Sequence, residues 1–215
     1  TVLSRGLGDV YKRQEFMKPN GNYLVAGVDE VGRGCLAGDV LAAAVILQPK
    51  KPIDDLTDSK AINALQRSFV YKEIIQNCIC YSIGRASVDE IDRFNILQAT
   101  LLAMKRAVDS LVIKPHRVMV DGNAIPRWEY ESEAIIKGDS KVPEISAASI
   151  IAKVTRDEEM NVLAKKYPGY GFEKNKGYGT PQHKAAIKAK GFCDCHRRTF
   201  SPISELINDR QEYLL

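Results

Sequence analysis

The stretch AGVDEVGRGCLAG, residues 26–38, places two adjacent acids at the end of an apolar run and directly before a Gly-Arg-Gly turn. Its GRGCLA portion has the spacing G-x-G-x-x-G/A of a dinucleotide-binding turn. That motif requires a helix after the glycines, with its N-terminus facing a pyrophosphate. Here the next segment, VLAAAVIL at residues 40–47, is typical of a buried strand, and Asp29 and Glu30 would repel the phosphates. Dinucleotide binding is therefore the weaker alternative, and two strands joined by a glycine turn are favoured.

Apolar periodicity extends this pattern along the chain. Ser87 and Glu90 form an S-x-x-E capping box at the start of a long helical pattern. Further helices are predicted over 63–77, from Pro143 and after Pro181, and strands over 23–28, 40–47, 79–86, 118–120 and 134–136. Three early strands followed by helix, strand, strand and helix predict an α/β fold with a mixed five-stranded sheet flanked by helices.

The chain divides into three expected parts. Residues 1–16 show no sustained periodicity, and Met17 followed by KPNGN is typical of a natural start, so we expect 1–16 to be a peripheral, non-native leader. Residues 17–165 are the expected catalytic domain. Residues 166–215 are the expected small, basic, helical C-terminal segment.

The positive charge of the chain is concentrated in one region. Residues 150–200 carry 11 Lys and Arg against 5 Asp and Glu, whereas the 149 residues before them are balanced. A basic segment on a neutral body predicts an anionic partner such as nucleic acid. A solvated, lysine-rich helix face is an equally good explanation of this feature by itself. No apolar stretch approaches the roughly 20 residues of a membrane-spanning helix, so no membrane partner is expected.

Five cysteines in 215 residues do not suggest a disulfide framework. Cys78 and Cys80 lie in a strand-like segment, and their thiols are expected to face opposite sides of a sheet. Cys193, Cys195 and His196 are the residue types of a partial zinc site, although their spacing is shorter than usual. A reduced, cytoplasmic protein is the simpler explanation.

Acidic residues recur at or just past the ends of apolar runs. If those runs share one sheet, the carboxylates converge near one edge, and their mutual repulsion requires a counter-ion. Carboxylate oxygens suit Mg²⁺ or Mn²⁺, and two such ions about 4 Å apart promote phosphodiester hydrolysis. The alternative for each single acid is a helix cap or a turn. The candidate ligands are Asp29, Glu30, Asp121 and Asp139.

Several motifs together resemble one family. VAGVDEVGRG, LTDSK, the VDG of 120–122, KGDSKVPEISAASIIAKVTRD, KGYGT and HRRTF occur in the order found in bacterial ribonuclease HII, from about Leu24 to Phe200. The resemblance implies a ribonuclease H-like fold and a metal-dependent endoribonuclease. Its expected activities are hydrolysis of RNA in RNA/DNA hybrids and cleavage on the 5′ side of single ribonucleotides embedded in duplex DNA. The implied reaction is two-metal-ion hydrolysis that leaves 5′-phosphate and 3′-hydroxyl ends, with no protein nucleophile.

The same resemblance implies roles for individual residues. The four acids bind the metal ions, and Gly32, Arg33 and Gly34 present backbone groups to the 2′-hydroxyl at the cleavage site. Tyr178 of KGYGT packs on the sugar of the neighbouring deoxynucleotide; the alternative is a bracing role in the C-terminal loop.

The resemblance also implies phosphate-binding residues, and this chain differs from the family pattern at one position. Lys60, Arg197 and Arg198 are the expected phosphate-binding residues, and isolated basic residues are otherwise usually solvated. Asp39 stands where the family more often has proline or a small residue. An extra acid there is expected to weaken substrate binding slightly or to alter metal occupancy.

Two other function classes fit parts of the pattern. A non-catalytic module that binds hybrids would need the basic segment but not all four acids. Another two-metal nuclease of the same fold, such as a resolvase, would not need KGYGT together with GRG. We therefore expect a ribonuclease H that acts as a monomer in the cytoplasm on nucleic acid.

Overall fold

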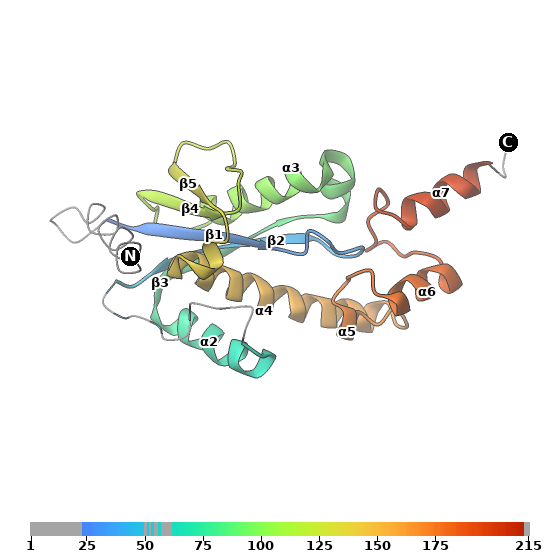
Figure 1. Cartoon of the computed structure of the whole chain (residues 1–215), viewed down its shortest axis with the longest axis horizontal. Coiled ribbons are helices and arrows are strands. Elements are labelled where there is room, and N and C mark those ends of the chain that lie inside the picture. Colours follow the sequence, from blue (N-terminus) through green and yellow to red (C-terminus); the bar gives the residue numbers. More distant parts are fainter. Residues whose placement is uncertain (1–22, 50, 52, 54–55, 57–61, 213–215) are drawn as a thin grey trace, which may run out of the picture.

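A five-stranded mixed sheet forms the centre of the molecule (Figure 1). The computed structural model describes the chain except for residues 1–22, 50, 52, 54–55, 57–61 and 213–215. The predictions for the leader and for Lys60 therefore lie outside the described residues. The strands, in the spatial order β3-β2-β1-β4-β5, are β1 (Val25–Val31), β2 (Val40–Leu47), β3 (Cys78–Ala86), β4 (Arg117–Asp121) and β5 (Glu131–Ile135). β1, β2 and β3 are antiparallel neighbours, while β4 runs parallel to both β1 and β5.

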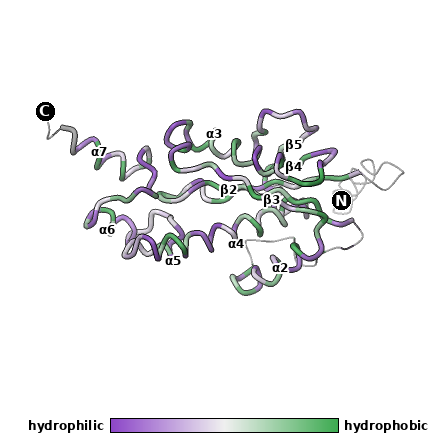
Figure 2. The backbone as a smooth tube through the Cα atoms, turned by 180° about the vertical axis from the view of Figure 1, so that it is seen from behind, coloured by the Kyte–Doolittle hydropathy of each residue, from purple (hydrophilic) through white to green (hydrophobic). Residues whose placement is uncertain are grey.

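Helices cover both faces of this sheet, as Figure 1 shows. α3 (Val88–Asp109) packs on one face, and α4 (Pro143–Lys166) and α2 (Ala64–Asn77) pack on the other. Along β2, Ala42, Ala44 and Ile46 belong to the core under α3, and Ala43 and Val45 to the core under α4. This two-sided burial explains why VLAAAVIL is apolar throughout and does not alternate. Along the helices, hydrophobic and hydrophilic positions alternate, as expected of helices with one buried face (Figure 2).

Local sequence features explain where the elements begin and how closely they pack. The predicted capping box is present: the N–H of Glu90 donates to Ser87 Oγ, and the Glu90 carboxylate accepts from the N–H of Ser87. At Gly27 an added Cβ would lie 2.0 Å from the Glu144 carbonyl carbon. Glycine is therefore required for α4 to pack directly on β1. This contact brings the middle of α4 close to the acids at the end of β1.

The C-terminal part packs against one end of the sheet (Figure 1). It contains α5 (Phe172–Asn175), α6 (Pro181–Lys190) and α7 (Ile203–Glu212), of which only α6 is predicted above. Phe172, Ile187 and Ile203 share a core with Leu36 and Ala37 of the β1–β2 loop. The C-terminal segment therefore helps to hold the loop that carries the Gly-Arg-Gly turn.

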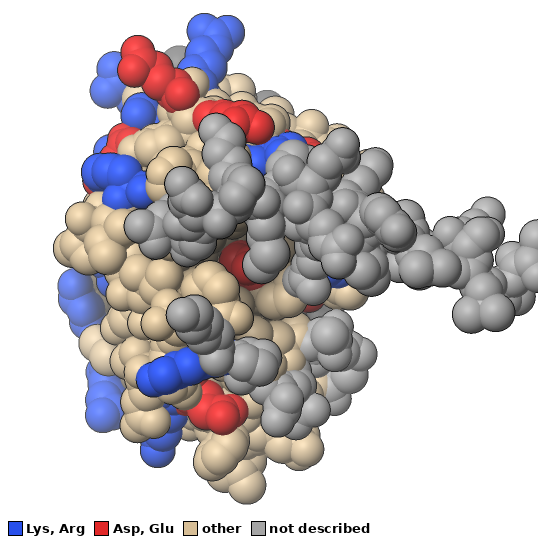
Figure 3. All heavy atoms as spheres, turned by 90° about the vertical axis from the view of Figure 1, so that its left-hand side faces the viewer, with Lys and Arg blue, Asp and Glu red and all other residues tan. Residues whose placement is uncertain are grey.

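Two further observations concern the surface. Among the described helices, none is both long and apolar enough to cross a membrane. At the end of the molecule opposite the C-terminal helices, Lys and Arg side chains lie along one margin and Asp and Glu side chains lie among them (Figure 3). The described part of this face therefore does not present a surface of one charge.

Candidate active site

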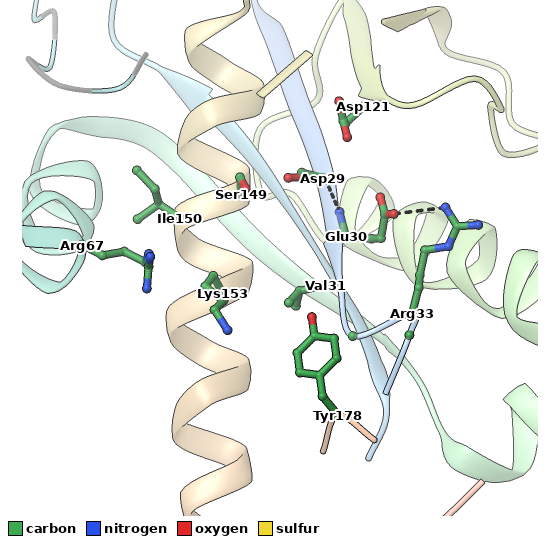
Figure 4. Close-up of a pocket in the computed structure, with 12 residues that line it drawn as sticks. Asp29, Glu30, Val31, Arg33, Arg67, Asp121, Ser149, Ile150, Lys153 and Tyr178 are labelled. Atoms are coloured by element: carbon green, nitrogen blue, oxygen red, sulfur yellow. Dashed lines mark hydrogen bonds and ion pairs between the residues drawn. The ribbon is translucent and has the colours of Figure 1, made fainter. Parts of the chain in front are cut away.

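Three acids converge where the parallel pairing of β1 with β4 ends. Val28 of β1 pairs with Val120 of β4, so the residues that follow them, Asp29 and Asp121, lie at the same edge of the sheet. The carboxylate oxygens of Asp29, Glu30 and Asp121 lie within 4.8 Å of one another (Figure 4). This arrangement confirms that acids from separate strands meet at one edge.

The environment of this group disfavours three negative charges. Asp29 is only 5% exposed. Burial, and then the charges of Glu30 and Asp121, hold the pKa of Asp29 well above its usual value, although hydrogen bonds from Ser149 and from the N–H of Glu30 oppose this. A cation among these oxygens would relieve the repulsion. Hard carboxylate ligands at this separation suit a divalent ion such as Mg²⁺ or Mn²⁺.

Asp139, the fourth predicted acid, lies beside this group. It is buried in a single turn of 3₁₀ helix, η1 (Gly138–Ser140). The N–H of Gly138 donates to Asp121 Oδ1 at 2.6 Å, which couples the turn to the end of β4. The structure thus brings three acids into one close group and places Asp139 on an adjoining turn.

The Gly-Arg-Gly turn borders the same cavity. Gly32 has φ +94°, and a Cβ there would lie 2.5 Å from Arg156 Nε, so both backbone conformation and space require glycine. Arg33 is exposed and forms an ion pair with Glu30 at 3.3 Å. The cavity has a volume of about 430 Å³ and is lined by Asp29, Glu30, Val31, Gly32, Arg33, Gly34, Arg67, Asp121, Ser149, Ile150, Lys153 and Tyr178.

Two buried arginines hold this loop from behind. Arg197 is 0% exposed, and its guanidinium donates to the carbonyl oxygens of Gly32 at 2.7 Å, Arg33 at 2.8 Å and Gly38 at 2.8 and 3.0 Å. Arg156 donates to the carbonyls of Ala37 and Asp39. Burial, and then the charge of Arg156, lower the pKa of Arg197 to about 10, so it remains charged at neutral pH.

The phosphate contact expected of Arg197 does not fit this placement. Its donors are directed to backbone carbonyls in the interior, where a nucleic acid backbone cannot reach them. The neighbouring Arg198 is exposed, and its backbone N–H donates to Asp92. Its side chain does not line the cavity described above. Lys60 lies outside the described residues.

The carbonyls held by Arg197 fix the direction of two amides. In a trans peptide the C=O and the N–H of the same plane point in opposite directions. Because Arg197 holds the carbonyls of Gly32 and Arg33, the N–H groups of Arg33 and Gly34 point away from it. Within the described part of the chain, these two N–H groups have no hydrogen-bond partner. They are therefore free to donate to a ligand in the cavity.

Tyr178 stands next to this turn. Its backbone forms a bridge with Cys35, and the N–H of Leu36 donates to the carbonyl of Gly177 at 2.7 Å. Tyr178 is 44% exposed, and its ring lies on the cavity wall (Figure 4). The backbone thus braces the loop while the ring stays accessible, so the two alternatives for this residue do not exclude each other.

Some cavity residues were missed by the sequence reasoning. Ser149 and Lys153 lie one helical turn apart on α4, and Arg67 comes from α2 (Figure 4). Lys153 also forms an ion pair with Asp157 at 2.8 Å. The signal for the α4 pair was the i, i+4 spacing inside ISAASIIAK, which places both residues on one helix face.

Asp39 lies apart from the acid group. Its Oδ1 accepts the N–H of Val88 at 3.2 Å, at the first turn of α3. Burial raises the pKa of its carboxyl. The expected effect of Asp39 on metal occupancy is therefore not supported by its position, because its carboxylate belongs neither to the acid group nor to the cavity lining.

Comparison with known proteins agrees with this site. The family profile described as Ribonuclease HII matches residues 26–203. The chain is 57% identical over 185 residues to a ribonuclease HII of Delftia acidovorans, an alignment that covers 86% of this chain and 79% of that protein.

Solved structures share the same architecture. The ribonuclease H2 of Pyrococcus horikoshii OT3 superposes with a TM-score of 0.74 at 30% identity, over 88% of this chain and 99% of that one. Bst-RNase HIII in complex with Mn²⁺ shares the fold, with a TM-score of 0.66 at 19% identity over 90% of this chain and 72% of that one. From the profile match and the sequence identity together, the chain belongs to the ribonuclease HII family.

Proposed function

We propose that Asp29, Glu30 and Asp121, with Asp139 beside them, hold two divalent cations at the phosphodiester that this enzyme cleaves. As a member of its family the chain is a metal-dependent hydrolase that acts on RNA in RNA/DNA hybrids, and incision at ribonucleotides embedded in duplex DNA is a family feature. The observation that carries the proposal is the group of three carboxylates within 4.8 Å at one edge of the sheet.

The donor chemistry of this group fits Mg²⁺ or Mn²⁺. All three side chains offer oxygen ligands. Burial and the negative charges of two acidic neighbours raise the pKa of the Asp29 carboxyl. When bound, such ions make water a better nucleophile and stabilise charge on the leaving oxygen. The acids hold the ions, and Ser149 and the N–H of Glu30 fix the orientation of Asp29.

The turn next to the acids supports a role in ribose recognition. The N–H groups of Arg33 and Gly34 face away from Arg197, and Gly34 has no Cβ to obstruct a sugar. We propose that these amides donate to the 2′-hydroxyl, the group that separates RNA from DNA at a given site. The exposed ring of Tyr178 is proposed to pack on the sugar of the neighbouring deoxynucleotide. Cleavage on the 5′ side of the ribonucleotide would then leave 5′-phosphate and 3′-hydroxyl ends.

Phosphate contacts come from basic residues around the cavity. Lys153 and Arg67 line it, and we propose that they join Arg198 and Lys60 in contacting the nucleic acid backbone. Such contacts position a duplex without reading its sequence. The excess of basic residues over 150–200 favours an anionic partner.

The deciding assay uses duplex DNA that contains one ribonucleotide, with Mg²⁺ or Mn²⁺ in separate reactions. We expect a single incision 5′ of the ribonucleotide by the wild-type chain and almost none by Asp121→Asn. Asp109→Asn is the matched control, because Asp109 is exposed, pairs with Lys105 and lies outside the cavity. No incision by the wild type, or full activity in Asp121→Asn, would overturn the assignment.

We also propose that the enzyme acts as a cytoplasmic monomer. All five cysteines are free, in keeping with a reducing compartment. Light scattering on the active fraction from size exclusion tests the oligomeric state. Activity confined to a dimer peak would contradict it.

A further inference from the structure

A second group of metal-ligating side chains lies behind the Gly-Arg-Gly loop, away from the carboxylates. Cys193, Cys195 and His196 bring two sulfurs and one ring nitrogen within 4.8 Å of one another. Cys193 Sγ is 3.3 Å from Cys195 Sγ and 3.1 Å from His196 Nδ1. From this convergence of two thiols and an imidazole nitrogen we propose that the chain carries a structural Zn²⁺ site formed by Cys193, Cys195 and His196.

The histidine is held in the tautomer that a metal ligand needs. His183 Nδ1 faces the carbonyl oxygen of Tyr178 at 2.9 Å, and a carbonyl only accepts, so this nitrogen carries the proton. The N–H of Cys193 donates to His196 Nδ1 at 3.1 Å, so this nitrogen of His196 accepts and the other, Nε2, carries a proton. His183 Nε2 is then an acceptor, and His196 Nε2, 3.0 Å away, must be its donor.

It follows that His196 Nδ1 has a lone pair, and this nitrogen faces the Cys193 thiol. The N–H of Cys193 also lies 3.1 Å from it, so metal binding would replace this weaker contact. A ligating histidine whose other nitrogen donates to a fixed acceptor is the usual arrangement in metal sites. Tyr170 and Phe172 pack around the two rings, with centroids 4.9 and 5.2 Å away, and keep them in place.

The donor separations are close to those of a zinc site. Zinc bonds of about 2.3 Å to sulfur and about 2.0 Å to nitrogen place tetrahedral ligands roughly 3.5–3.8 Å apart. The observed separations of 3.3 and 3.1 Å therefore need to widen by only a few tenths of an ångström. Two thiols also select zinc over Mg²⁺ or Mn²⁺, which prefer oxygen. The sulfurs bind as thiolates, so any proton that a thiol still carries is released to solvent on binding.

The residues around the site leave space for the ion and connect it to the Gly-Arg-Gly loop. A separate cavity of about 550 Å³ reaches Cys195 and Asp194, which leaves room for a water as the fourth ligand. The carbonyl of Cys195 accepts the N–H of Gly38 at 2.7 Å, and His196 is bridged to Ala37. The next residue is Arg197, which holds the Gly-Arg-Gly turn. A zinc ion would thus stabilise the segment that positions the proposed ribose-recognition loop.

Cobalt substitution of the full-length, reduced chain tests this site directly. We expect a thiolate-to-metal charge-transfer band that saturates at one thiolate-bound Co²⁺ per chain, and loss of the band when Zn²⁺ displaces that Co²⁺. The oxygen-only acid group cannot produce this band, so the two sites are distinguished. The double variant Cys193→Ser/Cys195→Ser should lose the band and bind Zn²⁺ more than about 100-fold more weakly, because even second-shell changes cost about 10- to 100-fold.

Cys78→Ser is the matched control, since Cys78 belongs to the other Cys-x-Cys pair, in β3, and should keep the band. Zn²⁺ should also raise the Tm of the wild type and of Cys78→Ser by more than that of the double variant, in which only the acid group remains to bind it. Absence of the band in the wild type overturns the proposal without reliance on any variant's folding. Its persistence in a double variant that folds does so too, as does isolation of the chain with Cys193 and Cys195 joined as a disulfide that binds no metal.

Discussion

Two buried charged regions of the molecule differ in how their charges are stabilised. One is the acid group of β1 and β4, and the other is the pair of arginines behind the Gly-Arg-Gly turn. Asp29, Glu30 and Asp121 crowd like charges together, and the pKa of Asp29 is raised as a result. Arg197 and Arg156 are also close and alike in charge, yet backbone carbonyls accept from their guanidinium groups. Buried carboxylates that repel one another more than their hydrogen bonds offset need a cation, whereas arginines whose donors are taken up by carbonyls support structure. The comparison therefore separates a binding site from a brace.

The largest expected effect comes from removing a charge from the acid group. Asp29→Asn should lower the rate of incision at a single ribonucleotide by about 1000-fold, since several kcal/mol of transition-state stabilisation depend on the ions proposed to bind there. Single-turnover kinetics with saturating enzyme measures this. Asp109→Asn should retain wild-type rates. A loss below tenfold for Asp29→Asn would place the metal ligands elsewhere.

Removing the brace should act mainly on stability. Arg197→Met leaves the carbonyls of Gly32, Arg33 and Gly38 without their donor, and unsatisfied buried groups cost about 1–3 kcal/mol each. We expect the free energy of unfolding to fall by roughly 3 kcal/mol in urea titrations. The adjacent Arg198→Met is the control and should change it by less than about 0.5 kcal/mol, because its side chain is exposed. Equal effects would remove the distinction between the two arginines.

Tyr178 connects the two regions, and its ring should matter for only one kind of substrate. Tyr178→Ala is expected to slow cleavage at a single embedded ribonucleotide about tenfold, which is about 1.4 kcal/mol. Cleavage of a long RNA/DNA hybrid should change less, because every sugar near the site then carries a 2′-hydroxyl. Parallel rates on both substrates measure the difference. Equal losses would leave Tyr178 with only its bracing role.

The smallest expected effect is a pH dependence of the metal-free protein. Because the folded pKa of Asp29 lies above its ordinary value of 3.8, the folded state holds that proton more tightly than the unfolded state. Loss of this proton lowers the free energy of unfolding as the pH rises from 3.8 through the raised pKa. The loss is about 1.4 kcal/mol for each pKa unit between the unfolded and the folded value. The difference in unfolding free energy between wild type and Asp29→Asn, measured against pH without metal, isolates it. A difference that does not vary with pH would contradict it.

Local sequence patterns predicted most of the fold. The limits of β2 were predicted exactly as found, because VLAAAVIL lies between turn residues and is buried on both faces. The capping box fixed the start of α3. The short elements η1, α5 and α7 were missed, since three to ten residues held by tertiary contacts carry little periodicity. Consequently the turn that carries Asp139 was not foreseen.

The site was predictable where strands determine it and less so where loops do. Asp29 and Asp121 follow paired residues of neighbouring strands, so their meeting followed from the sheet alone. Arg197 and Arg198 are adjacent in HRRTF, and nothing local indicates that one is buried and the other exposed. Their difference depends on a contact with a loop more than 150 residues away. Such contacts are properties of the tertiary structure and have no local signal.

The most direct test of the contrast measures the unfolding free energy of wild type and Asp29→Asn, each with and without Mn²⁺. If the acids are an uncompensated metal site, Asp29→Asn will be more stable than the wild type without metal. Mn²⁺ will then stabilise the wild type strongly and the variant hardly at all. A variant that is less stable than the wild type without metal, and that Mn²⁺ stabilises as much as the wild type, would contradict the account.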